Sequence, residues 1–232
     1  FSIDYEVITS LESLDNVISE IKKSGFFSFD TESRGLLWNR EPMICLSLCW
    51  GYDPGNKITT AILPFYNHDP TGSPWLLKPY WPNNEIVKTI HTKLKEIFED
   101  PSIEKTAHNL KYDSLVLKKH CGIDIQGFLY DTILLHHLLF EYPPHDLEYL
   151  ADIEFHTGNY SDELSKYVGT GKIKKSYDHV PDEVMWPYTA MDVQSGYRLK
   201  QLYHSRLLQK PHLWNVYIEE QEPFIKTATR SE

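Results

Sequence analysis

Gly25-Phe26-Phe27-Ser28-Phe29-Asp30 is an aromatic run that ends in an acid, and Glu32 follows two positions later. The phenylalanines of this short run favour a β-strand. Side chains two apart on a strand project to the same face, so Asp30 and Glu32 are predicted to point the same way where the strand ends. Two carboxylates so placed come within reach of one hard cation, although a lone Asp-x-Glu is more often a solvated strand end.

Regular elements are predicted on both sides of this strand. An amphipathic helix is predicted over 9–23, with Ser10 as its candidate cap. Strands are predicted over 43–50 and 57–65, and the turn-rich residues 51–56 between them favour an antiparallel meander with the first strand. Downstream, helices are predicted over 85–98, 109–120, 131–140 and 147–153, with a short strand over 103–107.

The remaining stretches are less regular. Residues 67–84 are rich in proline and aromatic residues, so no regular element is expected there, and residues 160–177 carry four lysines among glycines and are expected to form a mobile basic segment. Pro181 is predicted to start a short helix that Trp186-Pro187 interrupts, because a residue before proline is disfavoured in the α region. A long helix then resumes over 187–208. A meander followed by alternating helices and strands predicts an α/β fold with a mixed sheet.

Composition and charge bound the class of protein. The chain has 232 residues, 41% hydrophobic and 24% charged, which is typical of one soluble globular domain. Its formal net charge of −10 argues at face value against a nucleic-acid binder. That argument is weak, because an enzyme that holds metal ions on carboxylates needs acids at its site.

Cysteine usage and hydropathy bear on location. Cys45, Cys49 and Cys121 cannot all pair internally and lack zinc-type spacing, so free thiols in a reducing intracellular compartment are expected. The cytoplasm, the nucleoid, an organelle and a virus-infected cell all stay open. No stretch approaches the roughly 20 uninterrupted apolar residues of a membrane span, so no membrane partner is expected.

Two further pairs repeat a helical spacing of four residues. Asn109 and Asp113 are predicted to share one face of a helix, as are Tyr188 and Asp192 on the last long helix. Taken alone, the first pair is more often a helix cap with a surface acid, and the second more often a core tyrosine with a chance partner. A phenol and a carboxylate stacked one turn apart can hold a water molecule between them.

The order Asp-x-Glu, Asn-x-x-x-Asp, Tyr-x-x-x-Asp resembles the three motifs of the DEDD exonuclease superfamily in its tyrosine-bearing (DEDDy) branch. The segments that carry the resemblance are Phe29-Asp30-Thr31-Glu32, His108-Asn109-Leu110-Lys111-Tyr112-Asp113 and Tyr188-Thr189-Ala190-Met191-Asp192. Within that branch the sequence is most similar to the 3′–5′ proofreading domain of family A DNA polymerases, the bacterial polymerase I type. The resemblance extends over almost the whole chain.

The resemblance implies a fold, a domain boundary and a partner. The fold would be RNase H-like, with a mixed five-stranded sheet flanked by helices. Residues 1–222 would form the 3′–5′ exonuclease domain, and residues 223–232 would begin a linker or junction to a polymerase domain that this chain lacks. The chain is therefore expected to be a piece of a longer protein.

The resemblance also implies a two-metal site that uses Mg²⁺ or Mn²⁺, the cations that carboxylate oxygens suit. Asp30, Glu32 and Asp192 would bind the ion that activates water, with Asp30 bridging to a second ion that Asp113 holds through water. Tyr188 would orient the attacking water by a hydrogen bond.

The implied substrate is a single-stranded or frayed DNA 3′ end. Leu36 would lie against the terminal base, Asn109 and Tyr112 near the penultimate nucleotide, and Thr31 would also contact substrate. The basic segment around 172–175 would track the backbone or be a solvated loop, and Trp75 and Trp81 would stack on bases or pack as a lid.

Two other functions stay open at this point. One is an RNA-trimming DEDDy exonuclease that resembles RNase D. The sequence of residues 109–113 instead favours a relative of the polymerases. The other is a non-catalytic module that binds nucleic acid or braces a polymerase. The presence of all four metal-binding acids favours an active enzyme.

Overall fold

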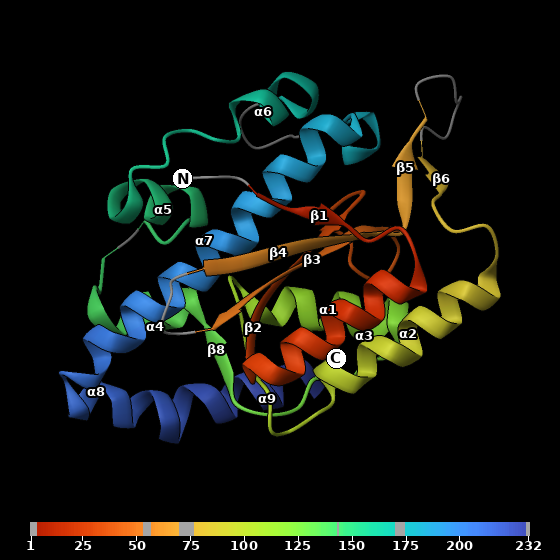
Figure 1. Cartoon of the computed structure of the whole chain (residues 1–232). Helices are drawn as coiled ribbons and strands as arrows, with labels where there is room; N and C mark the ends of the chain where they lie inside the picture. The colour runs from red at the N-terminus through yellow and green to blue at the C-terminus, as the bar shows by residue number, and fades with distance from the viewer. Residues whose placement is uncertain (1–3, 53–56, 70–76, 143, 170–174, 231–232) are drawn as a thin grey trace.

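A computed structural model describes residues 4–52, 57–69, 77–142, 144–169 and 175–230 of the chain (Figure 1). Its main sheet has six strands in the order β1-β4-β3-β2-β7-β8. These strands are β1 (Glu6–Val7), β4 (Lys57–Pro64), β3 (Met43–Tyr52), β2 (Phe26–Ser33), β7 (Glu104–Ala107) and β8 (Leu129–Asp131).

Strand β2 lies inside this sheet and carries the acidic pair. It runs antiparallel to β3 and parallel to β7, and β3 runs antiparallel to β4, which confirms the predicted meander. Its register with β3 places Asp30 opposite Ser47 and Glu32 opposite Cys45, and the register shifts just after Glu32. The two acids therefore lie where regular pairing of the central strand ends.

The sheet is wider than the five strands implied by the resemblance. The additional strand is β1, two residues long, which pairs in parallel with β4. Strand β8 ends at Asp131, the first residue of the helix that the sequence predicted over 131–140, and α4 (Thr132–Leu139) follows it directly. A mixed sheet flanked by helices is nevertheless the predicted fold class.

Helices cover both faces of the sheet (Figure 1). They are α1 (Leu11–Ser24), α2 (Asn84–Phe98), α3 (Leu110–Cys121), α4, α5 (Leu147–Phe155), α6 (Asp162–Val168), α7 (Asp182–Leu208), α8 (Pro211–Val216) and α9 (Glu222–Arg230). Helix α1 shows why the local prediction held: Ser10 and Ser13 form a reciprocal capping box, and Gly25 ends the helix at a φ of 70°.

The two faces of β2 differ in what covers them. Phe27 and Phe29 pack edge-on against Phe98 of α2, with ring centroids 5.1 and 5.0 Å apart respectively. On the other face α7 crosses the sheet, and a Cβ added to Gly196 would lie only 3.1 Å from the hydroxyl oxygen of Ser28. The alternation of one strand thus directs Phe27 and Phe29 toward α2 and the two acids toward α7.

Two predictions about helix boundaries are wrong. Helix α7 runs from Asp182 to Leu208 without interruption, with Pro187 inside it. Proline removes a single backbone donor near the start of this helix, and burial of many α7 residues outweighs that loss. Asn109 is not in α3 but precedes it at a left-handed φ of 62°, so it does not stack one turn before Asp113.

Regular structure also occurs in both stretches expected to lack it. Strands β5 (Tyr66–His68) and β6 (Leu77–Pro79) form an antiparallel pair within the proline-rich region. The buried Trp81 follows them, and its indole N–H donates to the carbonyl of Pro64 at 2.7 Å, so its role is packing. Helix α6 lies in the expected basic segment. Trp75 and residues 53–56 and 170–174 lie outside the described residues.

The C-terminal helices pack on the sheet edge. Tyr217, in a π-helical segment (Tyr217–Gln221), is buried, donates its hydroxyl to the carbonyl of Leu129 at 2.9 Å and accepts from the backbone N–H of Asp131. Glu222 accepts from the N–H of Leu129. Helix α9 begins at Glu222 and continues past residue 223. The domain boundary between residues 222 and 223 stays a prediction. In the described part of the chain, no helix combines the length and apolarity needed to cross a membrane.

Candidate active site

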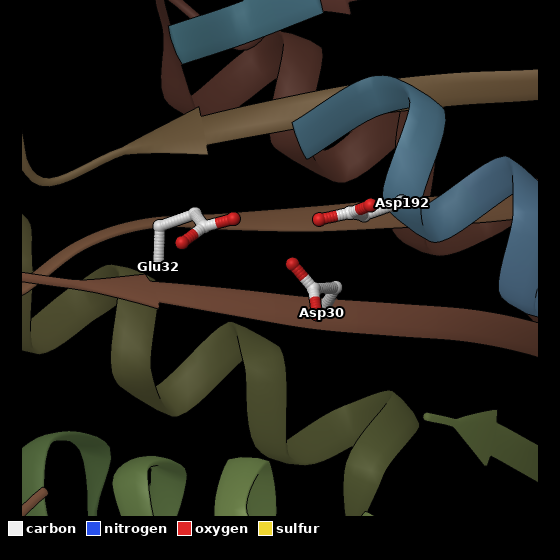
Figure 2. A group of neighbouring side chains, drawn as sticks. All are labelled: Asp30, Glu32 and Asp192. Atoms are coloured by element: carbon white, nitrogen blue, oxygen red, sulfur yellow. The ribbon is translucent and has the colours of Figure 1, made fainter. Parts of the chain in front are cut away.

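Three carboxylates converge between β2 and α7. Asp30 and Glu32 come from β2 and Asp192 from α7, and each offers an oxygen within 4.8 Å of the others. Figure 2 shows Glu32 and Asp192 pointing toward each other, with Asp30 rising from β2 into the space between them. Glu32 and Asp192 are buried. The sequence-predicted pairs therefore meet at one place from opposite ends of the chain.

Two hydroxyl groups contact Asp30. Thr189, three residues before Asp192, is fully buried and hydrogen-bonds both the Asp30 carboxylate and, at 3.0 Å, the hydroxyl of Ser47. Ser47 in turn donates to the backbone carbonyl of Asp30 at 3.3 Å. This chain of contacts joins β3, β2 and α7 at Asp30.

The electrostatics of this cluster favour a bound cation. Burial raises the pKa of Asp30 well above its usual value, and the charges of Glu32, Asp113 and Asp192 raise it further. Its Oδ2 atom is buried and has no hydrogen-bond partner among the described residues. An orphaned carboxylate oxygen among other carboxylates is what a hard divalent cation would satisfy, so the donor set fits Mg²⁺ or Mn²⁺.

Asp113 lies beside this cluster and not within it. It is buried at the start of α3 and accepts from the backbone N–H of Thr31 at 3.0 Å and from the Thr31 hydroxyl at 2.6 Å. Burial raises its pKa to about 7, against the lowering effect of the Thr31 hydrogen bonds. Both Thr31 donors are thus directed at Asp113, and a substrate contact by Thr31 stays a prediction.

Tyr188 holds a protonated phenol at the edge of the cluster. Burial, followed by the charges of Asp192 and Glu32, raises its pKa well above 10. Tyr177 approaches from the segment before α7, and a hydrogen bond joins its side chain to Tyr188. A phenol that keeps its proton can donate a hydrogen bond and does not serve as a base near neutral pH.

The remaining predicted substrate residues surround the acids without joining them. Leu36 is 88% exposed in the loop after β2, and the hydroxyl of Tyr112 donates to the carbonyl of Gly35 at 3.3 Å. The backbone N–H of Asn109 donates to the carboxylate of Asp131 at 3.2 Å. Their roles in substrate binding stay predictions.

Sequence reasoning assigned no site role to two residues that shape the site, although Asp131-Thr132 is one of the segments that match the family pattern. Asp131, at the end of β8, accepts from the backbone N–H groups of Leu110 and Ile133 at 2.9 Å each and so fixes the starts of α3 and α4. Tyr160 donates its hydroxyl to Oδ1 of Asp192 at 2.6 Å. An Asp-Thr pair before an apolar helix is a capping signal for the first; no local pattern marks the second.

Comparison with known proteins defines the family. Residues 5–207 match the DNA polymerase A family described as 3′-5′ exonuclease. The chain belongs to this exonuclease family. This exonuclease domain is 30% identical over 234 residues to DNA polymerase I of Rhizobium leguminosarum, covering 98% of the chain and 22% of that protein. It is also 32% identical over 139 residues to the DNA polymerase of Escherichia phage T5, covering 54% of the chain and 16% of that protein.

Solved structures support the fold. Escherichia coli RNase D matches with a TM-score of 0.68 at 15% identity, over 99% of this chain and 51% of that chain. NrnC of Brucella melitensis matches with a TM-score of 0.64 at 19% identity, over 97% and 91%. The same protein with bound Mg²⁺ has a TM-score of 0.58 at 18% identity, over 99% and 92%. The RNase H-like fold class is thereby confirmed.

Proposed function

We propose that this domain is a metal-dependent 3′–5′ exonuclease that hydrolyses the terminal phosphodiester of single-stranded or frayed DNA 3′ ends and releases nucleoside 5′-monophosphates. The observation that carries the proposal is the convergence of Asp30, Glu32 and Asp192, with Asp113 beside them. Membership of the exonuclease family supports the reaction class.

The protein side chains divide the work of this reaction. Asp30, Glu32 and Asp192 would hold one divalent ion, and Asp30 together with Asp113 a second. Two such metal ions would neutralise the charge that develops on the phosphate and activate the attacking water in an in-line displacement. Tyr188 keeps its proton, and its hydroxyl would orient the attacking water through a hydrogen bond.

Substrate choice between DNA and RNA rests on the relatives. The sequence relatives that cover nearly the whole chain are DNA polymerases, which favours DNA. The second candidate is an RNA-trimming exonuclease, because the structural neighbours include an RNase D. Because these structural neighbours are less than 20% identical to the chain, they show a shared fold and do not indicate a shared substrate. The substrate proposed is therefore DNA, which the sequence relatives favour.

Matched oligonucleotides test this proposal. DNA and RNA strands of one sequence, labelled at the 5′ end, are incubated with Mg²⁺ or Mn²⁺ and with EDTA. We expect a ladder that shortens from the 3′ end of DNA and disappears in EDTA. Faster shortening of the RNA strand would replace the DNA assignment. Binding of either strand without cleavage would favour a non-catalytic bracing module.

The length of the polymerase relatives supports a proposed partner domain, and the free cysteines support a proposed compartment. The domain spans about a fifth of the length of the first polymerases it matches, for example 22% of the Rhizobium protein, and we propose that a polymerase domain accompanies it, joined through residues 223–232. Cys45, Cys49 and Cys121 are free and buried. These free thiols support the proposal of a reducing intracellular compartment.

A further inference from the structure

Tyr160 contacts the active site from outside the predicted motifs. Its hydroxyl lies 2.6 Å from Oδ1 of Asp192, and its ring centroid lies 6.1 Å from that of Tyr188. A hydrogen bond from a neutral donor to a carboxylate is of the stronger kind. One oxygen of Asp192 is therefore held by a phenol while the carboxylate also faces Asp30 and Glu32.

The turn that carries Tyr160 is itself anchored. The next residue, Ser161, donates its backbone N–H and its hydroxyl to the two carboxylate oxygens of Glu148 on α5, at 2.9 and 2.7 Å. Gly158 donates its N–H to Asp152 of the same helix at 2.9 Å and adopts a φ of 66°, a left-handed conformation that suits glycine. Two acids of α5 thus fix the backbone on which Tyr160 is mounted.

We propose that Tyr160 is a positioning residue for the metal site: its hydroxyl fixes the carboxylate of Asp192 so that Asp192 stays directed at Asp30 and Glu32. This inference rests on the proposed metal-dependent function. Hydrogen bonds that orient metal ligands contribute about 10- to 100-fold to metal affinity or activity. Because α5 holds the Tyr160 turn, the rigidity of that helix is transmitted to the site.

A different role would leave a different signature. If the ring of Tyr160 contacted only the substrate, removing its hydroxyl would raise the KM for an oligonucleotide and leave metal affinity unchanged. If the hydroxyl orients Asp192, its removal weakens metal binding in the absence of any substrate and lowers kcat, with KM largely unchanged. Metal affinity without substrate therefore separates the two roles.

The experiment measures Mn²⁺ binding to the substrate-free chain by electron paramagnetic resonance. Tyr160→Phe is compared with the wild type and with Tyr167→Phe, a matched change on α6 at a residue that is 37% exposed. We expect about tenfold weaker Mn²⁺ binding for Tyr160→Phe, a similar loss of kcat at fixed Mn²⁺, and wild-type values for Tyr167→Phe. Glu148→Gln, which loosens the turn, is expected to weaken Mn²⁺ binding by a smaller factor.

One result would overturn the proposal: Mn²⁺ affinity of Tyr160→Phe within twofold of the wild type, whether or not Glu148→Gln weakens Mn²⁺ binding. Circular dichroism of each variant confirms that the fold is kept. Mn²⁺ binding needs no turnover, so a wild type that binds Mn²⁺ but cleaves no oligonucleotide would contradict the proposed function and leave the role of Tyr160 measurable.

Discussion

The two faces of strand β2 have different roles: one contributes to the hydrophobic core and the other carries acids of the candidate active site. On one face Phe27 and Phe29 pack against Phe98 and belong to the hydrophobic core. On the other, Asp30 and Glu32 lie beside Asp192, and the pKa of Asp30 is raised by burial and then by the charges of its acidic neighbours. The apolar face stabilises the fold, and that stability holds the acids together against their mutual repulsion. Changing each face separately tests this division.

The largest effect is expected on the acidic face. Asp30→Asn removes a carboxylate that is proposed to bind both metal ions. It should lower the rate of 3′-end hydrolysis by about 1,000-fold, since metal ions supply several kcal/mol of transition-state stabilisation. The same change should leave the metal-free fold as stable as the wild type or more stable, because one repelling buried charge is gone. Oligonucleotide digestion and urea unfolding of one preparation give both values.

The opposite change should reverse this pattern. Phe29→Ala removes a buried ring that is 1% exposed and should lower the free energy of unfolding by about 3–5 kcal/mol. Below its unfolding midpoint the variant should keep a metal-dependent activity within a few-fold of the wild type. Loss of Mn²⁺ binding in folded Phe29→Ala protein would show that the two faces are not separable.

A pH experiment sharpens the comparison at Asp113. Its pKa is raised to about 7 in the folded chain from 3.8, so between those values the folded state holds a proton that the unfolded state has lost. In EDTA this group therefore makes the free energy of unfolding fall as pH rises from about 4 to about 7, by at most about 1.4 kcal/mol per pH unit.

The matched variant for this experiment is Asp113→Asn, which cannot titrate. Its urea unfolding series should show a weaker decline of stability over the same pH range. Identical pH dependence in the two proteins would contradict a raised Asp113 pKa.

The smallest effect is expected at Thr189, which connects the two sides of the site. Thr189→Val removes its hydrogen bonds to Asp30 and Ser47 and should lower the free energy of unfolding by about 1 kcal/mol. Since Thr189 lowers the pKa of Asp30, the acid limb of the pH–rate profile should move to higher pH. Ser205→Ala, on the exposed part of the same helix, is the control and should leave the profile in place.

Much of this structure could be predicted from local sequence signals. Ser10 and Gly25 mark the ends of α1 because capping and left-handed termination depend on individual residue types. Asp30 and Glu32 share a face because strand geometry has a period of two, and Tyr188 and Asp192 lie one helical turn apart. These spacings placed three acids that meet in space, although Asp192 lies more than 150 positions after the other two.

The features that could not be predicted depend on tertiary contacts. Asn109 takes a left-handed conformation next to Asp131, which accepts from its backbone N–H. Helix α7 passes through Pro187 because both its flanks are buried. Tyr160 stands in a turn with no periodicity, and only the contacts of that turn with α5 bring it to Asp192. Local sequence patterns do not predict such contacts between segments that are far apart in the chain.

The most direct test of the central claim is digestion of a 5′-labelled DNA strand with a 3′ overhang by wild type, Asp30→Asn and Asp192→Asn, across a titration of Mn²⁺. The account predicts a 3′-shortening ladder that rises with Mn²⁺ in the wild type and is absent in both variants, while Glu85→Gln, a change of an exposed acid on α2, behaves as wild type. Undiminished cleavage by Asp30→Asn, or a wild type that binds Mn²⁺ and leaves the strand intact, would contradict it.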